Sequence, residues 1–340
     1  MNDKSRLREK VIGRLAPSPT GSQHLGNART FLLAWWLARS VGGKLFLRIE
    51  DLDTPRIKPW AKGQAIEDLK WLGIDWDDIP QSKDSLNSDS ADETYWIQSN
   101  RTQRYAEVLD RLKALEAIYP CTCTRSDIEA SQSAPHELVS SNLEGPAHLD
   151  GVVYPGTCSS RCVRDTEQLD AKQQKYAWRF RFSSQPKHWE DQFAGIQELS
   201  NPQQKLGDFV VARSNGSPAY QIAVVVDDHD MGVNQVVRGA DLIYSTYRQL
   251  AIYELLNWSP PSHYHFPLVV GPDGKRLAKR HGDTRLSLYR EQGVAPERVI
   301  GFLAYHSGWT DREESMTARD LLSIDLLSRQ SSDVLVVNGF

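Results

Sequence analysis

Apolar and polar positions follow one another in a regular order along the first part of the chain. A short apolar run at 11–15 predicts a buried strand, and a second run at 44–49 predicts another. Between them, the stretch that begins near Gly26 has the apolar spacing of a helix. The same spacing predicts an amphipathic helix over 60–72, with Gly73 as its C-terminal cap. The pattern therefore predicts strand, helix, strand and helix in that order.

The second half of the chain contains a stretch that is apolar at nearly every position. Residues 209–213 and 220–226 predict two paired strands, because Asn215-Gly216 between them is typical of a hairpin turn. The second of these strands is apolar throughout its C-terminal part, as expected for a strand buried on both faces. A helix is predicted from Ala295-Pro296-Glu297 onward.

Two other segments have a polar character. Residues 80–91 are rich in Ser and Asp without periodicity, which predicts a surface loop. Residues 176–182 alternate arginines with aromatic residues, which predicts a strand with arginines on one face and aromatic side chains on the other. The arginine face fits a nucleic-acid surface and a solvated face of a half-buried strand equally well.

Composition narrows the class of protein. With 340 residues, the chain is long enough for a catalytic domain with a sizeable core plus an insertion or a small second domain. A net charge of −4 argues against a wholesale polyanion binder, so any contact with nucleic acid must use a local basic face. No apolar run approaches a membrane span, and the polar residues 1–10 lack the core of a signal peptide. We expect a soluble, cytoplasmic protein.

Four cysteines lie between Cys121 and Cys162. In a cytoplasmic chain, such clustering indicates metal binding rather than disulfides. Cys121 and Cys123 are one residue apart and present two thiolates to one point, so Cys158 and Cys162 downstream can close a tetrahedral zinc site. The alternative is four unrelated thiols. A zinc ion held by protein ligands alone has no open position, which favours a structural role.

The segment from Arg14 to Asn27 joins the first predicted strand to the first predicted helix through two prolines. Gly21 and Gly26 permit a close approach of the backbone, and the unpaired N–H groups of a helix N-terminus attract phosphate. His24 adds a donor beside them. Taken alone, a loop of this kind is most often a turn.

Several motifs in this order resemble those of class I aminoacyl-tRNA synthetases in their glutamyl form. Residues 17–21 (Pro-Ser-Pro-Thr-Gly) and 24–26 (His-Leu-Gly) resemble the nucleotide-binding signature of the family, with Asn27 where a second histidine is usual. Residues 48–51 (Arg-Ile-Glu-Asp) resemble its second landmark. Residues 276–280 (Arg-Leu-Ala-Lys-Arg) resemble the lysine loop that closes over ATP.

The resemblance extends from Val11 to Trp309 and implies an α/β fold. The expected catalytic domain is a Rossmann-like parallel sheet, split by a zinc-bearing insertion and followed by a short helical segment. The implied divisions are 1–118 for the first half of the catalytic domain, 119–200 for the insertion, 201–285 for the second half with the lysine loop, and 286–340 for a short helical C-terminal region without an anticodon-binding domain.

The resemblance implies ATP-dependent activation of L-glutamate, with Mg²⁺ accompanying the nucleotide. His24 and Lys279 match the residues that stabilise the α-phosphate in the transition state, and we expect them to be the catalytic residues. His24, Gly26 and Lys279 are the expected ATP-binding residues. A compact ammonium group on a loop suits charge that develops only during the reaction.

Five positions match the amino-acid pocket of the family: Arg14, Ser18, Glu50, Tyr220 and Arg238. Glu50 aligns with the glutamate that holds the α-ammonium group of the substrate. An arginine suits a pocket that must tell glutamate from glutamine, because a guanidinium grips a carboxylate with two hydrogen bonds. The sequence leaves open whether Arg14 or Arg238 meets the side-chain carboxylate.

For the metal, the resemblance implies Zn²⁺ bound by Cys121, Cys123, Tyr154 and Cys158. Cys162 is the rival fourth ligand, because a thiolate is ordinarily a better zinc donor than a phenol. The sequence does not decide between Tyr154 and Cys162.

The acceptor is inferred from length. Full glutamyl-tRNA synthetases continue into a large anticodon-binding region, whereas this chain has about thirty residues after Trp309. It therefore resembles the short members of the family, which place glutamate on the queuosine base in the anticodon of tRNA(Asp). One alternative is a fragment of an ordinary glutamyl-tRNA synthetase that charges the 3′ end of tRNA(Glu), and another is a non-enzymatic tRNA-binding relative. We expect a monomer with no membrane partner.

Overall fold

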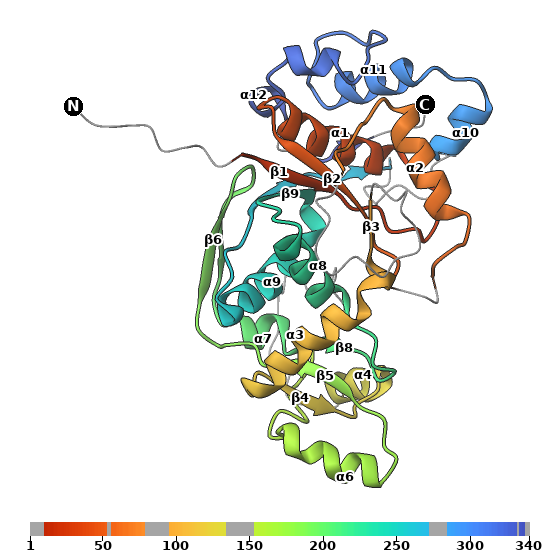
Figure 1. Ribbon diagram of the computed structural model, residues 1–340. Coiled ribbons are helices and arrows are strands. Elements are labelled where there is room, and N and C mark those ends of the chain that lie inside the picture. The colour runs from red at the N-terminus through yellow and green to blue at the C-terminus, as the bar shows by residue number, and fades with distance from the viewer. Residues whose placement is uncertain are drawn as a thin grey trace.

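A parallel sheet lies at the centre of the protein (Figure 1). The computed structural model describes residues 10–52, 56–78, 95–133, 153–271, 284–331 and 333–336. Three parallel strands form one part of the sheet: β1 (Ile12–Leu15), β2 (Lys44–Ile49) and β3 (Trp96–Ile97). Two more parallel strands form the other part: β9 (Gln235–Gly239) and β10 (Ser262–Phe266). The backbone N–H of Asn234 donates to Ile12 O at 3.0 Å, which places β9 beside β1.

Helices cover both faces of this sheet (Figure 1). On one face lie α1 (Leu25–Arg39), α2 (Ala61–Trp71), α10 (Leu286–Glu291), α11 (Pro296–His306) and α12 (Leu326–Arg329). On the other face lie α8 (Tyr220–Asp230) and α9 (Ile243–Leu256). The apolar face of α11 packs with α1 and with the fully buried Trp309 in one continuous core. Burial of this apolar surface fixes the C-terminal helices against the first half of the sheet.

A smaller antiparallel sheet forms the far end of the molecule. Its strands are β4 (Ile118–Cys121), β5 (Ala177–Phe180) and β8 (Phe209–Ala212). The helices associated with it are α3 (Thr102–Ala114), α4 (Arg125–Ser133), α6 (Thr166–Ala171) and α7 (Pro202–Leu206). A separate hairpin pairs β6 (Lys187–Asp191) with β7 (Gly195–Leu199), and a short parallel pair joins β11 (Val269–Val270) to β12 (Leu335–Val336).

Most of the elements predicted from the apolar pattern are confirmed. The predicted strands at 11–15 and 44–49 correspond to β1 and β2, and the helix begun near Gly26 is α1. Gly73 follows α2 with a φ of +72°, as a C-terminal cap requires. The predicted loop over 80–91 lies outside the described residues.

The prediction of a strand over 220–226 is wrong, because these residues form the first part of α8. The chain does reverse at Asn215-Gly216, where Gly216 has a φ of +83° and Arg213 N donates to Ser217 O. Ala219 is extended, and the helix begins directly after it. Residues 222–226 are buried on every side, so a helix here shows the same unbroken apolar run as a buried strand.

Arg179 in β5 and Arg181 directly after it both contact other parts of the protein. Arg179 is 8% exposed, lies 3.9 Å from the centre of the Tyr154 ring and donates to Asp208 O. Arg181 lies 4.5 Å from the centre of the Tyr119 ring and donates to Ser159 O. The aromatic Phe180 is buried on the opposite face. The predicted alternation is confirmed, but neither interpretation of the arginine face, as a nucleic-acid surface or as a solvated face, holds for the buried Arg179.

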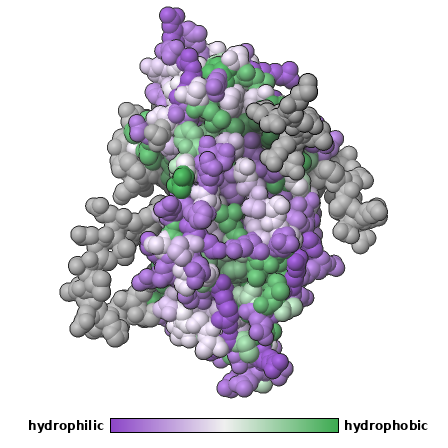
Figure 2. Space-filling view, turned by 90° about the vertical axis from the view of Figure 1, so that its left-hand side faces the viewer, coloured by the Kyte–Doolittle hydropathy of each residue, from purple (hydrophilic) through white to green (hydrophobic). Residues whose placement is uncertain are grey.

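The surface mixes polar and apolar residues. Figure 2 shows the left-hand face of Figure 1, where polar side chains are interspersed with several smaller apolar areas. A mean hydropathy of −0.50 agrees with this mixture. Within the described residues, no helix has both the length and the apolar content needed to cross a membrane.

Candidate active site

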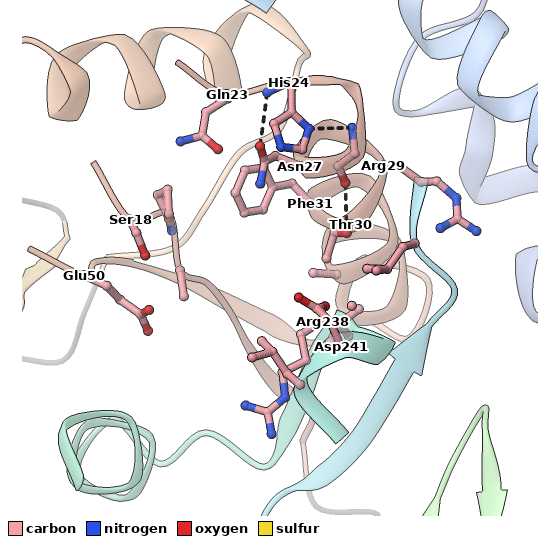
Figure 3. A pocket seen from close by; sticks show the side chains of 18 of the residues that line it. Ser18, Gln23, His24, Asn27, Arg29, Thr30, Phe31, Glu50, Arg238 and Asp241 are labelled. Atoms are coloured by element: carbon pink, nitrogen blue, oxygen red, sulfur yellow. Dashed lines mark hydrogen bonds between the residues drawn. The ribbon is translucent and has the colours of Figure 1, made fainter. Parts of the chain in front are cut away.

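A cavity of about 630 Å³ lies at the carboxyl ends of β1, β2 and β9, where ligands bind in open α/β sheets. We call it the pocket. The structure brings seven predicted site residues to its wall: Arg14, Ser18, His24, Gly26, Glu50, Tyr220 and Arg238. Figure 3 shows Ser18 and Glu50 on one side of the pocket, His24 at the start of α1, and Arg238 on the side opposite His24. Lys279 lies outside the described residues.

His24 is the N-cap of α1. Its Nδ1 accepts a hydrogen bond from Gly26 N at 3.1 Å, and its own backbone N–H donates to Asn27 Oδ1 at 3.1 Å. The Asn27 backbone N–H also donates to the His24 side chain, so His24 and Asn27 form a capping box in which Asn27 has the role usual for Glu or Gln. Because Nδ1 is an acceptor, the neutral ring carries its proton on Nε2.

Close packing explains why residue 26 is a glycine. A Cβ added at Gly26 would lie 3.1 Å from the His24 ring and 3.5 Å from the Cβ of Val269. The chain that flanks residues 272–283 on either side also meets this helix end, since Leu25 N donates to Thr284 O and Val269 lines the pocket. Residues 24–27 and the two flanks of the predicted lysine loop therefore meet at the start of α1.

Glu50 is held by a buried arginine. Arg48 Nη2 lies 3.0 Å from Glu50 Oε1, and Arg48 Nη1 lies 2.5 Å from Asp228 Oδ1. Arg48 is fully buried, and three carboxylates around it raise its pKa despite burial. Burial raises the pKa of Glu50, although Arg48 and Arg14 act in the opposite direction. Glu50 thus reaches the pocket as a buried carboxylate whose charge is balanced by a neighbour.

The two candidate arginines for the substrate carboxylate differ in their partners. Arg14 Nε lies 3.4 Å from Asp228 Oδ1, so Arg14 has an acidic partner inside the protein. Arg238 is 4% exposed and donates only to uncharged groups among the described residues, namely His265, Thr246 and Gln249. Its Nη1 is buried and has no hydrogen-bond partner there. Burial lowers the pKa of Arg238, as expected for a cation without a nearby paired carboxylate.

Three of the four cysteines form a cluster. The Sγ atoms of Cys121, Cys123 and Cys158 all lie within 4.8 Å of one another. The Tyr154 hydroxyl lies 3.4 Å from Cys121 Sγ and 4.0 Å from Cys123 Sγ. Cys162 is exposed and caps a 3₁₀ turn through its backbone, outside this cluster. The arrangement brings together the three thiols and the phenol of the predicted ligand set.

The acidic residues after Val226 serve a structural purpose. Asp227 accepts hydrogen bonds from Arg101, Gln98 and Tyr105, and Asp230 pairs with Arg101 and Arg104. His229 stacks on Trp258 with a centroid distance of 3.8 Å. Among the described residues, Asp227 and Asp230 are thus partnered by side chains of the protein itself.

Sequence reasoning missed four buried groups around the pocket: Arg48, Asp228, His265 and Asp191. Arg48 belongs to the motif at 48–51, and Asp228 follows an apolar run. Both residues therefore lie next to a recognisable sequence pattern. Asp191 and His265 lie in segments without any such pattern. Their importance follows only from the contacts that the fold creates.

The parallel sheet, the capped helix with its histidine and the pocket at the strand ends define the catalytic domain of a class I tRNA synthetase. The family model described as tRNA synthetases class I (E and Q), catalytic domain, matches residues 10–338. The chain therefore belongs to this family, and within it to the group of relatives named glutamyl-Q tRNA(Asp) synthetase.

Three comparisons illustrate the relationship. The glutamyl-Q tRNA(Asp) synthetase of Rhodopirellula baltica is 49% identical over 321 residues, which cover 93% of this chain and 91% of that protein. That of Symbiobacterium thermophilum is 44% identical, with 94% and 93% covered. The crystal structure of a glutamate tRNA ligase from Elizabethkingia meningosepticum in complex with its amino acid has a TM-score of 0.75 at 25% identity, covering 96% of this chain and 67% of that one.

Proposed function

We propose that the protein activates L-glutamate with ATP and Mg²⁺ and transfers the glutamyl group to queuosine in the anticodon of tRNA(Asp). In the first step, a glutamate α-carboxylate oxygen attacks the α-phosphorus of ATP, which forms glutamyl-adenylate and releases pyrophosphate. In the second step, a nucleophilic group of queuosine takes the glutamyl group and releases AMP. The names of the relatives from Rhodopirellula baltica and Symbiobacterium thermophilum support this reading, since each match covers at least 91% of both chains.

The buried Arg238 carries the proposal for the amino acid. It lines the pocket, its Nη1 has no partner among the described residues, and no described carboxylate pairs with it. A buried guanidinium without a counterion is a binding site for an anionic group, because an unpaired charge is costly in a protein interior. We therefore assign the side-chain carboxylate of glutamate to Arg238 rather than to Arg14.

The remaining contacts follow from this assignment. Glu50 reaches the same pocket and would receive the α-ammonium group, since its carboxylate is held in place by Arg48. Arg14, which is paired with Asp228, would contribute positive potential near the carboxylates of the substrate. Ser18 and Tyr220 line the same wall and offer hydroxyl groups for hydrogen bonds.

ATP would bind at the N-terminus of α1. The positive end of the helix dipole lies here, and the His24 ring presents its Nε2 proton beside it. Gly26 leaves room for the His24 ring at this helix end. The assignment of Lys279 to the α-phosphate rests on the sequence motif alone, as this residue lies outside the described part of the chain.

Zinc fits the cysteine cluster. A tetrahedral zinc site has metal–sulfur distances of about 2.3 Å, which separate neighbouring sulfurs by roughly 4 Å. Cys123 Sγ and Cys158 Sγ are 3.6 Å apart, and the Tyr154 hydroxyl lies close to two of the thiols. Cys121, Cys123, Tyr154 and Cys158 would hold the ion, which would tie β4 to the segment after Tyr154. This cluster lies in residues 119–200, which we propose as the insertion between the two catalytic halves.

The acceptor is tested by offering labelled glutamate and ATP to three RNAs: tRNA(Asp) with queuosine, tRNA(Asp) without queuosine, and tRNA(Glu). We expect acid-precipitable label only on the first. The unmodified tRNA(Asp) is the matched control, since it differs only at the proposed acceptor base. Label on tRNA(Glu) alone would instead identify a glutamyl-tRNA synthetase, and would overturn the acceptor assignment.

ATP–pyrophosphate exchange measured without tRNA separates the enzymatic from the non-enzymatic reading. We expect glutamate-dependent exchange in the absence of any tRNA. A protein that shows no exchange with glutamate, with or without tRNA, would be a tRNA-binding relative without synthetase activity.

A further inference from the structure

Arg238, His265 and Asp191 form a continuous chain of buried side chains beside the pocket. Arg238 Nε donates to His265 Nε2 at 2.9 Å, and His265 Nδ1 lies 2.6 Å from Asp191 Oδ2. The three residues are 4%, 1% and 2% exposed, respectively. They come from β9, β10 and β6, and Arg238 and His265 are direct register partners in the parallel pair. The hairpin that carries Asp191 therefore reaches the arginine of the pocket through a single histidine.

The direction of these hydrogen bonds fixes the proton on His265. A guanidinium can only donate, so His265 Nε2 must be an acceptor, and the neutral ring then carries its proton on Nδ1. That proton is donated to Asp191. Burial lowers the pKa of His265 to about 4, so the ring is neutral near pH 7.

Asp191 is itself held firmly. Its Oδ1 accepts hydrogen bonds from the backbone N–H groups of Phe193, Ala194 and His265, at 3.0, 2.7 and 3.1 Å. Its Oδ2 is thereby aimed at the imidazole. A carboxylate placed against Nδ1 in this way selects the ring form whose other nitrogen accepts from Arg238.

The other donors of Arg238 are also restrained. Nη2 donates to Thr246 Oγ1 at 2.5 Å and to Gln249 Oε1 at 2.9 Å. Thr246 Oγ1 also lies 3.1 Å from His265 Nε2, which places the histidine at the junction of these contacts. Nε and Nη2 are thus engaged, and Nη1 is the donor left without a partner among the described residues.

We infer that Asp191 and His265 are positioning residues for amino-acid selectivity, because they hold the Arg238 guanidinium so that its remaining donor receives the side-chain carboxylate of glutamate. This inference rests on the proposed function and adds to it residues that do not touch the substrate. It also gives the β6–β7 hairpin a part in substrate selection, although the hairpin lies outside the sheet that forms the pocket.

Two substitutions separate an acceptor role from simple packing. His265→Leu keeps a similar volume but removes the acceptor for Arg238 Nε, whereas His265→Gln keeps an acceptor oxygen near the position of Nε2. In glutamate-dependent ATP–pyrophosphate exchange, we expect His265→Leu to raise the KM for glutamate about tenfold or more, with the KM for ATP unchanged. We expect His265→Gln to restore most of this loss.

Asp191→Asn tests the tautomer. Its amide oxygen can still accept the backbone N–H groups, but its amide N–H would face Nδ1 and favour the ring form with a proton toward Arg238. We expect the KM for glutamate to rise about tenfold in this variant. We expect the same change to have little effect in the His265→Gln background, because an amide has no tautomer to select. Such non-additivity is what a double-mutant cycle detects.

His263→Leu is the matched control. His263 is 3% exposed on the same strand, two residues from His265, and no described hydrogen bond joins it to Arg238. We expect this variant to lose stability in thermal unfolding and to keep the wild-type KM for glutamate.

The outcomes distinguish the two levels of the proposal. A wild-type protein without glutamate-dependent exchange would overturn the proposed function itself. An active wild type whose His265→Leu and Asp191→Asn variants keep its glutamate KM, or whose His263→Leu control loses as much, would overturn only the positioning role. If His265→Leu does not fold, the comparison of Asp191→Asn alone and in the His265→Gln background decides the matter, since equal effects in both would refute a tautomer selected by Asp191.

Discussion

Arg48 Nη1 lies 2.5 Å from Asp228 Oδ1, and both side chains are buried beside the pocket. The same Asp228 oxygen lies 3.4 Å from Arg14 Nε, while Arg48 also reaches Glu50. One carboxylate from α8 thus holds two arginines from β1 and β2. Removing its charge would leave cations buried without full compensation.

Asp228→Asn should lower the free energy of unfolding by about 3 kcal/mol, because breaking a buried ion pair strands the remaining charge. Urea unfolding monitored by circular dichroism measures this. Asp110→Asn is the matched control, since Asp110 pairs with Lys113 at the surface and its side chain is 72% exposed. We expect the control to cost less than about 1 kcal/mol. Equal losses in the two variants would show that the buried pair contributes no special stability.

Arg238→Gln should raise the KM for glutamate about a hundredfold, because a charge-assisted contact to the substrate carboxylate is lost. The preference for glutamate over glutamine should fall in parallel, whereas the KM for ATP should stay unchanged. ATP–pyrophosphate exchange with each amino acid measures these values. Arg111→Gln serves as the control, since Arg111 donates to Leu256 O away from the pocket. An unchanged preference in Arg238→Gln would assign the carboxylate to another residue, with Arg14 the next candidate.

Cys158→Ser should abolish stoichiometric zinc, because a buried thiol of the cluster is replaced by a weaker donor. Cys162→Ser should retain it, since Cys162 lies outside the cluster. Elemental analysis of the purified proteins gives the zinc content of each. Tyr154→Phe asks whether the phenol is the fourth ligand, and we expect weaker zinc retention against a chelator. Loss of zinc in Cys162→Ser with full retention in Tyr154→Phe would reverse the choice between them.

Asp68 should make stability depend on pH in mildly acidic solution. It is 1% exposed on α2, and burial raises its pKa to about 6 although Arg290 lies 3.3 Å away. The folded protein therefore binds this proton more tightly than the unfolded chain, so the free energy of unfolding falls as the pH rises from about 4 to about 6. Asp68→Asn should remove this part of the pH dependence and stabilise the protein at pH 7.

Urea unfolding at several pH values between 4 and 7 measures this effect. Glu67→Gln is the control, since Glu67 is the preceding residue on the same helix and its side chain is 66% exposed. An Asp68→Asn variant whose pH profile runs parallel to that of the wild type would exclude Asp68 as the source.

The fold could be predicted best where the apolar pattern has a single interpretation. The run at 11–15 and the helix after Gly26 became β1 and α1 because turn residues bound each of them. The prediction for residues 220–226 was wrong because complete burial removes the periodicity that distinguishes a helix from a strand. The β-branched valines there favour a strand, and packing against α3, β8 and α9 overrode that preference.

The site could be predicted where its residues belong to motifs. His24, Glu50 and Arg238 come from three distant segments, and the structure brings all three to one pocket. Asp191 and His265 lay beyond prediction, because nothing in their neighbours marks them and their contacts arise only when β6 packs against β10. Likewise, only the structure shows that Cys162 lies outside the cluster of the other three thiols.

The capping box at the start of α1 has a consequence for the nucleotide. The His24 ring is anchored at Nδ1 by Gly26, and its backbone is anchored by the Asn27 side chain. These contacts already restrict rotation of the His24 side chain in the folded protein. Binding of a triphosphate would therefore cost less side-chain entropy, because the donor is preorganised. Through this box, the amide of Asn27 would influence turnover by holding the backbone of His24.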